Sequence, residues 1–329
     1  MNKIKVHFES NFNPDFIAKN VSVINKNYLV SSGGYNQINE NLLNTKSYIY
    51  KNDIDVLFLI IDNEFLNFDF FEKIKPRKKQ IISTYKRFEK LIKYCLKNSG
   101  TNIFISFIPL NATEKNNSLY ENMELYNENI YYEKFKHFLF TIFENNYRVN
   151  FCDLSKIFFK YGSDIILDNR LKYITKSPFS KKGVELISKQ INSYIKILFT
   201  PRKKLIVVDL DNTLWGGVIG EELFENIKLS NTGEGKAYYD FQNKLKELHN
   251  MGFLIAAVSK NNESDVKKFI KKHPFQIIKI EDFVTYRINW KNKDENIISI
   301  IEELKIGENS LVFIDDNPFE INLIKKNIP

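Results

Sequence analysis

The chain has 329 residues, of which 43% are hydrophobic, and a formal net charge of +8 at pH 7. Two cysteines argue against a disulfide framework, and the apolar runs are too short to span a bilayer. The start of the sequence, residues 1–5, lacks the apolar core of a signal peptide. The short basic clusters lack interleaved aromatic residues, so a nucleic-acid partner is not expected. These features predict a cytoplasmic protein with no membrane partner, long enough for two domains.

The first half, residues 1–200, alternates strand and helix patterns, which predicts an α/β domain. Strand-like apolar runs occur at Lys5–Phe8, Asp55–Ile61 and Asn102–Ile108. Helical patterns extend from Pro76 to Asn98 and from Tyr131 to Asn145.

Three residues of this half, Ser10, Gly34 and Asn111, resemble the first three markers of SGNH hydrolases. In those enzymes a serine attacks an ester, and Gly and Asn donate to the oxyanion. The fourth marker, an Asp-x-x-His segment, would fall around Leu171–Gly183, where no histidine is present. Without that base Ser10 is not an activated nucleophile, so we expect a catalytically silent, SGNH-like (flavodoxin-like) α/β/α domain. A simple turn explains Gly33-Gly34 equally well.

The second half, residues 201–329, opens with an apolar strand, Leu205–Val208, that leads into Asp209 and Asp211. In an extended backbone these two carboxylates would share one face. One carboxylate can attack phosphorus while the other moves protons. Two anions beside a phosphate need a lysine and a divalent cation, for which Mg²⁺ fits best. Alone, the pattern is equally compatible with solvated acids in a turn.

Two further apolar runs end in polar residues. Phe253–Val258 precedes Ser259-Lys260-Asn261-Asn262, and Leu311–Ile314 precedes Asp315-Asp316-Asn317-Pro318. Between Ser259 and Lys293 there is room for a helix, a strand and a turn, and Lys293 opens another helical pattern. The runs predict a parallel sheet whose carboxyl strand ends bring these side chains together. Each residue also has a structural explanation, as a strand-end cap, a solvated lysine or a helix N-cap.

Together, in this order, the residues resemble the haloacid dehalogenase superfamily of phosphotransferases, which implies a Rossmann-like sheet, here without a large cap insertion. The resemblance implies that Asp209 is the nucleophile, Asp211 the general acid/base, Ser259 the phosphate-binding hydroxyl and Lys293 the charge-neutralising lysine, with Lys291 as the competitor for that role. Mg²⁺ would be bound by Asp209, Asp211, Asp315 and Asp316, with Asp316 the preferred direct ligand. Substrate contacts are predicted for Thr213, Trp215, Gly216, Gly217, Lys260, Asn261 and Asn317.

Residues 215–217 are predicted to form a mobile flap, in which the glycines permit turns and Trp215 supplies a contact face. The alternative is a hydrophobic staple under the following loop.

A narrower resemblance is to the FkbH-like proteins of the HAD-IIIC group. It rests on Leu214–Glu221, Val258–Glu263, Arg287–Trp290 and Phe313–Pro318. In that family the implied role is to take a glyceryl unit from 1,3-bisphosphoglycerate, remove phosphate and load the acyl group onto an acyl carrier protein. Relatives often carry Cys where this chain has Val258, which weakens the acyl-loading inference. The two cysteines of the chain, Cys95 and Cys152, are predicted to be buried.

The expected function is therefore that of a Mg²⁺-dependent phosphatase or phosphotransferase acting on a phosphorylated small molecule such as 1,3-bisphosphoglycerate, or on a carrier-linked substrate. The alternatives are a non-catalytic assembly module that binds a carrier protein, and a phosphatase of sugar phosphates or nucleic-acid 3′ ends. The abrupt end after the helical pattern Phe319–Asn327 leads us to expect a C-terminal domain that is shortened or truncated.

Overall fold

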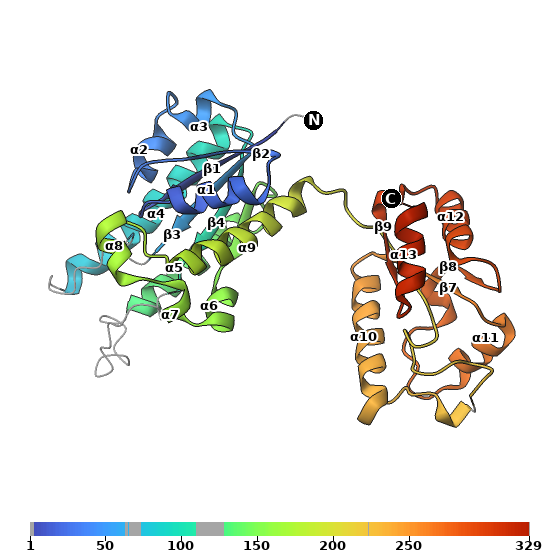
Figure 1. Ribbon diagram of the computed structural model, residues 1–329. Coiled ribbons are helices and arrows are strands. Elements are labelled where there is room, and N and C mark those ends of the chain that lie inside the picture. Colours follow the sequence, from blue (N-terminus) through green and yellow to red (C-terminus); the bar gives the residue numbers. More distant parts are fainter. Residues whose placement is uncertain (1–2, 63–64, 66–73, 110–127, 223, 329) are drawn as a thin grey trace. The chain divides into compact units, whose positions relative to one another are not determined.

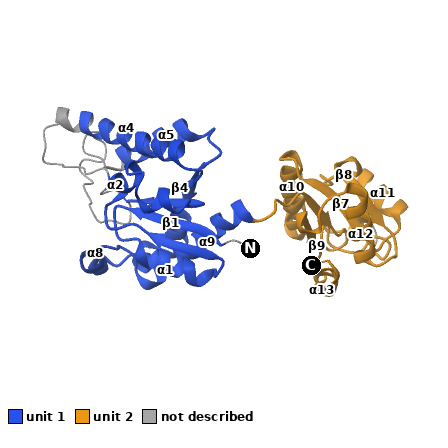
Figure 2. Ribbon diagram, turned by 90° about the horizontal axis from the view of Figure 1, so that it is seen from above, with its two compact units in different colours: residues 1–199 blue, residues 200–329 orange. Residues whose placement is uncertain are grey.

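The chain forms two compact units, residues 1–199 and 200–329, in a computed structural model (Figures 1 and 2). The structure describes residues 3–62, 65, 74–109, 128–222 and 224–328. Each unit contains one parallel sheet with a hydrophobic core on both of its faces.

The sheet of the first unit has five parallel strands in the order β2-β1-β3-β4-β5. This is the flavodoxin-like order of a doubly wound fold. The order in which successive strands are added to the sheet reverses between β1 and β3, while all strands stay parallel. All six residues of the central strand β3 are buried, as expected for a parallel strand covered on both faces. The strands are β1 (Ile4–Ser10), β2 (Tyr28–Ser32), β3 (Val56–Ile61), β4 (Asn102–Phe107) and β5 (Val149–Asp153).

Helices cover both faces of this sheet. On one face α1 (Asp15–Ile24) and α9 (Lys181–Phe199) pack against each other and against apolar residues of β1 and β3. The other face is covered by α2 (Ile38–Leu43), α3 (Tyr48–Lys51), α4 (Ile74–Asn98) and α5 (Glu128–Phe143). The short helices α6 (Ser155–Tyr161), α7 (Ser163–Ile166) and α8 (Asn169–Thr175) connect β5 to α9.

The sheet of the second unit has four parallel strands in the order β8-β7-β6-β9. The strands are β6 (Leu205–Val208), β7 (Leu254–Ser259), β8 (Phe283–Ile288) and β9 (Leu311–Ile314). Val208 is level with Ala257 on one side and Ile314 on the other. The polar residues that follow these three strands therefore emerge at the same edge of the sheet.

Two helices cover each face of this second sheet. On one face lie α10 (Lys236–Asn250) and α11 (Glu263–Lys272), and on the other α12 (Lys293–Leu304) and α13 (Pro318–Asn327). Short 3₁₀ turns occupy Phe224–Asn226, Gly233–Gly235, Ile280–Asp282 and Glu308–Ser310. None of the helices within the described ranges is long and apolar enough to cross a membrane.

Candidate active site

Asp209 lies directly after β6 and is 4% exposed. Its backbone N–H donates to the carbonyl oxygen of Ile314 at 2.9 Å, which keeps the chain beside β9 for one residue beyond the strand. Burial raises the pKa of the Asp209 carboxyl to about 6; the cation of Lys293 opposes this shift and the carboxylate of Asp315 adds to it. The predicted nucleophile is therefore a largely dehydrated carboxyl group.

Lys293 is the first residue of α12 and is 6% exposed. Its Nζ lies 3.0 Å from Oδ1 of Asp209 and 2.7 Å from Oδ2 of Asp315. Burial disfavours the ammonium ion, but the two carboxylates outweigh this cost and the pKa of Lys293 is raised. The competing Lys291 is exposed, so the structure brings Lys293 to the predicted nucleophile.

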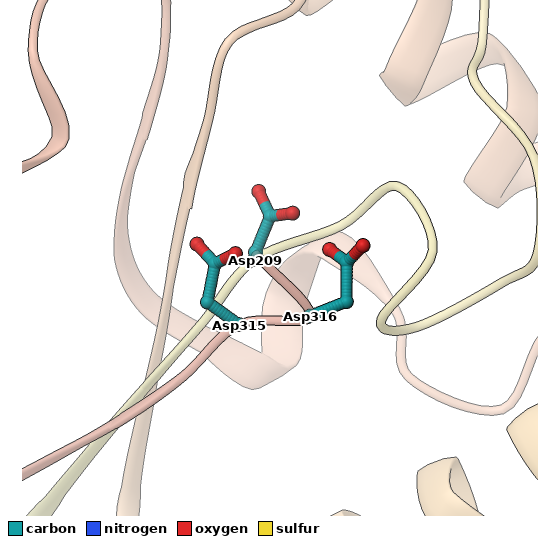
Figure 3. A group of neighbouring side chains, drawn as sticks. All are labelled: Asp209, Asp315 and Asp316. Carbon is teal, nitrogen blue, oxygen red and sulfur yellow. The ribbon is translucent and has the colours of Figure 1, made fainter. Parts of the chain in front are cut away.

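Three carboxylates gather at this edge. One oxygen each of Asp209, Asp315 and Asp316 lies within 4.8 Å of the others, and the side chains point to the same side of the two strand ends (Figure 3). Oxygen ligands at about 2.1 Å from one octahedral Mg²⁺ are at most about 4.2 Å apart. Small side-chain rotations would therefore bring these three carboxylates to the distances that one Mg²⁺ requires. This all-carboxylate donor set fits a hard divalent cation.

The loop after β9 is fixed by its own hydrogen bonds. The backbone N–H of Asn317 donates to Oδ1 of Asp315 at 2.8 Å, and that of Asp316 donates to Oγ1 of Thr213 at 3.2 Å. Thr213, predicted as a substrate contact, thus joins the β6 loop to the β9 loop. Asp316 is exposed while Asp315 is buried against Lys293, which leaves Asp316 the more accessible to solvent.

Asp211 is held by hydrogen bonds from the loops after β6 and β7. Its Oδ1 accepts from Trp215 Nε1 at 2.9 Å and from the Ile219 N–H at 3.2 Å, and its Oδ2 accepts from Asn261 Nδ2 at 2.6 Å. Among the described residues, the acidic groups that could together hold a metal ion are those of Asp209, Asp315 and Asp316, and a metal-binding role for Asp211 stays a prediction. β6 ends at Val208, so Asp209 and Asp211 do not lie in a regular strand in which their side chains would share one face.

Ser259 is the last residue of β7 and is 2% exposed. Its carbonyl oxygen accepts from the Asn289 N–H at 3.0 Å, which joins the loop after β7 to the loop after β8. The side chains of Asn289 and Asn296 exchange two hydrogen bonds, of 3.2 and 3.0 Å, which tie the β8 loop to α12. The sequence patterns did not single out this asparagine pair.

The predicted flap has a different character in the structure. Trp215 is fully buried, with its ring 4.8 Å from that of Phe269, so it does not offer the contact face that was predicted. A Cβ on Gly216 would lie 2.7 Å from the ring of Tyr238. Gly217 has a φ of 105°, and its N–H donates to Oδ1 of Asn212 at 2.8 Å. The glycines serve a tight turn, and the alternative of a hydrophobic staple describes Trp215 better.

Two further predicted contacts are engaged with the protein itself. Lys260 Nζ lies 2.7 Å from Oε1 of Glu320, which is 5% exposed. Asn317 caps α13, since its Oδ1 accepts from the Phe319 N–H at 2.9 Å. Sequence reasoning missed Glu320, because a glutamate in the first turn of a helix is already explained by the helix dipole.

The SGNH-like markers lie in the first unit. Ser10 ends β1 and is fully buried, and its Oγ accepts from the Phe12 N–H at 3.1 Å. The N–H of Gly34 donates to Oε1 of Gln37 at 3.1 Å, while Asn111 lies outside the described residues. His7 lies on the opposite face of β1 from Ser10, because side chains alternate along a strand. It contacts Glu9 at 2.9 Å and Ser31 at 2.8 Å instead.

A cavity of about 760 Å³ lies in the first unit, beside β4, α5 and β5. Its lining combines phenylalanines, among them Phe107, Phe140 and Phe151, with polar and charged side chains such as Glu133. None of the predicted site residues that the structure describes lines it. Cys152 borders it, but burial raises the pKa of that thiol to about 12, and burial also raises the pKa of Cys95. Both cysteines are buried, as predicted.

Comparison with known protein families finds a match in the C-terminal part of the chain. The profile of the family described as haloacid dehalogenase-like hydrolase matches residues 174–327. The C-terminal part of this chain is a haloacid dehalogenase-like hydrolase domain. A comparison with curated proteins finds no match.

Comparison with solved structures finds two similar chains of unequal likeness. One is the N-terminal part of the protein BF1531 from Bacteroides fragilis, containing a phosphatase domain complexed with Mg. It aligns with a TM-score of 0.83 and 26% identity over 100% of this chain and 88% of that chain. The other, a proposed platelet activating factor from Streptococcus pneumonia, has a TM-score of 0.35 and 14% identity over 59% of this chain and 85% of that chain. The predicted enzyme class, a phosphatase of the haloacid dehalogenase superfamily, is confirmed by the family match and the first structure.

Proposed function

We propose that this protein is a Mg²⁺-dependent phosphatase or phosphotransferase that forms an aspartyl-phosphate on Asp209. The observation that carries the proposal is the position of Lys293 between Asp209 and Asp315, with Asp316 beside them. The similar structure from Bacteroides fragilis was solved with Mg, which supports the choice of ion.

The residues divide the reaction into two steps. Oδ of Asp209 attacks phosphorus, the ester P–O bond breaks, and the leaving oxygen takes a proton from Asp211. Water then attacks the phosphorus of the aspartyl-phosphate and gives its proton to Asp211, which frees inorganic phosphate and restores both carboxyl groups. Ser259, at the end of β7, donates a hydrogen bond to a phosphate oxygen.

Two cations, Mg²⁺ and the ammonium group of Lys293, would offset the negative charge of the phosphate and the carboxylates. Mg²⁺, when held by Asp209, Asp315 and Asp316, supplies positive charge against the phosphate oxygens. Lys293 adds a fixed cation that needs no reorganisation, since it is already held between Asp209 and Asp315.

The substrate we propose is a phosphoglyceryl compound or a carrier-linked phosphate ester, as the FkbH-like resemblance implies. The similarity over the whole chain to the BF1531 fragment, which contains a phosphatase domain, supports a phosphorylated substrate. Val258 belongs to β7 and is fully buried in the core beneath α12 and α13, and both cysteines are buried in the first unit. Any acyl transfer would therefore use a thiol of the carrier protein rather than a thiol of this chain.

A substrate panel tests this function. Phosphate release would be measured with Mg²⁺ from 1,3-bisphosphoglycerate plus acyl carrier protein, from sugar phosphates and from 3′-phosphorylated DNA. We expect the highest kcat/KM with the phosphoglyceryl donor and no release in EDTA. A higher kcat/KM with the sugar phosphates or the DNA would overturn the proposed substrate but would still support a phosphatase activity. Carrier binding with no release from any compound, unchanged in Asp209→Asn, would favour an assembly module instead.

A further inference from the structure

The carboxylate of Asp211 is held by three N–H donors that come from two separate loops. Trp215 and the backbone of Ile219, both in the loop after β6, donate to Oδ1 at 2.9 and 3.2 Å. Asn261, in the loop after β7, donates to Oδ2 at 2.6 Å. This set of donors is separate from the contacts that Lys293 makes with Asp209 and Asp315.

The Trp215 donor is rigid. Its side chain is fully buried and packs on Phe269 of α11. The backbone on both sides is also fixed, since Gly216 exchanges two hydrogen bonds with Lys228, of 3.0 and 2.8 Å. The fully buried Gln242 donates to the carbonyl oxygen of Leu214 at 2.8 Å. The indole N–H therefore stays aimed at one oxygen of Asp211.

The two oxygens of Asp211 have partners of different chemistry. An indole N–H and a backbone N–H can only donate, so Oδ1 cannot carry a proton without losing Trp215 or Ile219. Asn261 can turn its amide over and present its oxygen, so Oδ2 can carry a proton and still be hydrogen-bonded. Asn261 is 4% exposed and lies two residues after Ser259.

We propose that Trp215 and Asn261 are positioning residues for proton transfer: Trp215 fixes Oδ1 of Asp211 as an acceptor, so that Oδ2, beside Asn261, delivers the proton to the leaving oxygen and later receives one from water. This inference rests on the proposed function, in which Asp211 is the general acid. It assigns a role to the buried Trp215 other than substrate contact or core packing alone.

The consequence is a specific dependence on the leaving group. Departure of an alkoxide or phenoxide of high pKa needs a proton, whereas departure of 2,4-dinitrophenolate does not. Loss of the indole N–H should therefore slow the hydrolysis of esters with poor leaving groups and spare the ester with the best one. A residue that only binds substrate or only stabilises the fold would slow all the esters by a similar factor.

The test uses the full chain with saturating Mg²⁺ and a series of aryl phosphates: phenyl, 4-nitrophenyl and 2,4-dinitrophenyl. The slope of log kcat/KM against the leaving-group pKa is measured for the wild type, Trp215→Phe, Asn261→Ala and Asp211→Asn. The matched control is Trp290→Phe, which removes the indole N–H of the other tryptophan, bonded to Asn262 at 3.2 Å. Circular dichroism checks that each variant is folded.

We expect Trp215→Phe to lower kcat/KM for phenyl phosphate about 10- to 100-fold more than for 2,4-dinitrophenyl phosphate, part of the effect of losing a general acid. Asn261→Ala should steepen the slope in the same direction, Asp211→Asn should steepen it most, and Trp290→Phe should leave it at the wild-type value. Wild-type slopes in both Trp215→Phe and Asn261→Ala would overturn the inference while leaving the phosphatase intact. If Trp215→Phe does not fold, the slope of Asn261→Ala alone decides. A wild type inactive on every ester, and on the substrate panel, would overturn the proposed function and this inference with it.

Discussion

In both units, polar residues follow the carboxyl ends of the strands of a parallel sheet, but their contacts differ. In the first unit these groups bond to one another: the N–H of Asp62, after β3, donates to Oδ1 of Asn11, after β1, at 3.1 Å, and Nδ2 of Asn11 donates to Oδ1 of Asp62. In the second unit three carboxylates approach a common point, and the buried Lys293 contacts two of them. Position at a strand end is thus common to both units.

The difference lies in the balance of charge. The hydrogen-bonded pairs of the first unit satisfy donors with acceptors, as buried polar groups generally do. The cluster of the second unit holds three acidic groups against one lysine, so it has negative charge left to attract a cation. An unbalanced, partly buried group of like charges is the stronger sign of a functional site.

The largest effect should come from Asp209→Asn, which removes the proposed nucleophile. We expect phosphate release to fall at least about a thousandfold, because the covalent route is lost. Steady-state release from the best panel substrate measures it, and Asp240→Asn on the exposed face of α10 is the control. Full activity of Asp209→Asn would show that the cluster is not the reacting site.

Replacing the shared lysine should have the next largest effect. Lys293→Met should lower kcat about a hundredfold or more, since a preorganised cation is lost. It should also destabilise the metal-free protein by about 3 kcal/mol, because two buried carboxylates lose their counter-ion. Mg²⁺ should restore part of this loss in a thermal melt. The exposed Lys291→Met is the control, and an equal loss of activity in that variant would contradict the assignment.

The raised pKa of Asp209 predicts a smaller, pH-dependent effect. With a folded-state pKa of about 6, the folded protein retains this proton in the range where an unfolded Asp has lost it. The contribution of Asp209 to the stability of the metal-free protein therefore falls as the pH rises from about 4 to 6.

Mg²⁺ must displace the same proton below pH 6, so its apparent affinity should drop about tenfold between pH 7 and pH 5. The increase in Tm on adding Mg²⁺, measured at pH 5 and pH 7, checks this. An increase as large at pH 5 as at pH 7 would contradict it.

The smallest effect is expected in the first unit. Because Ser10 is buried and its Oγ already accepts from the Phe12 N–H, Ser10→Ala should change phosphate release by less than about twofold. The wild type should show no esterase activity on 4-nitrophenyl acetate beyond that of Ser10→Ala. Esterase activity that disappears in Ser10→Ala would show that the first unit is catalytic.

Much of this site follows from local sequence patterns. Apolar runs located β6, β7 and β9, and the carboxyl ends of parallel strands meet, so Asp209, Ser259 and Asp315 could be grouped in advance. What the patterns did not predict depends on contacts between residues distant in the sequence. The bond from Asn261 to Asp211 joins residues 50 positions apart, and the pairing of Lys260 with Glu320 joins residues 60 positions apart.

The burial of Trp215 shows the same limit. A tryptophan followed by two glycines is compatible with both a flap and a staple, and only the packing against Phe269 and the bond to Asp211 distinguish them. In the first unit the short edge strand β2 was not singled out, because Tyr28–Ser32 carries only a weak apolar pattern.

The most direct test of the central claim is to trap the covalent intermediate. The full chain would be mixed with Mg²⁺ and its best panel substrate, quenched in acid within the first turnover, and reduced with borohydride, which converts an aspartyl-phosphate to homoserine. Peptide mass spectrometry should find homoserine at position 209 in the wild type, and none without Mg²⁺ or in Asp209→Asn. Homoserine at Asp315 or Asp316, or turnover with no reduced residue at all, would contradict the account.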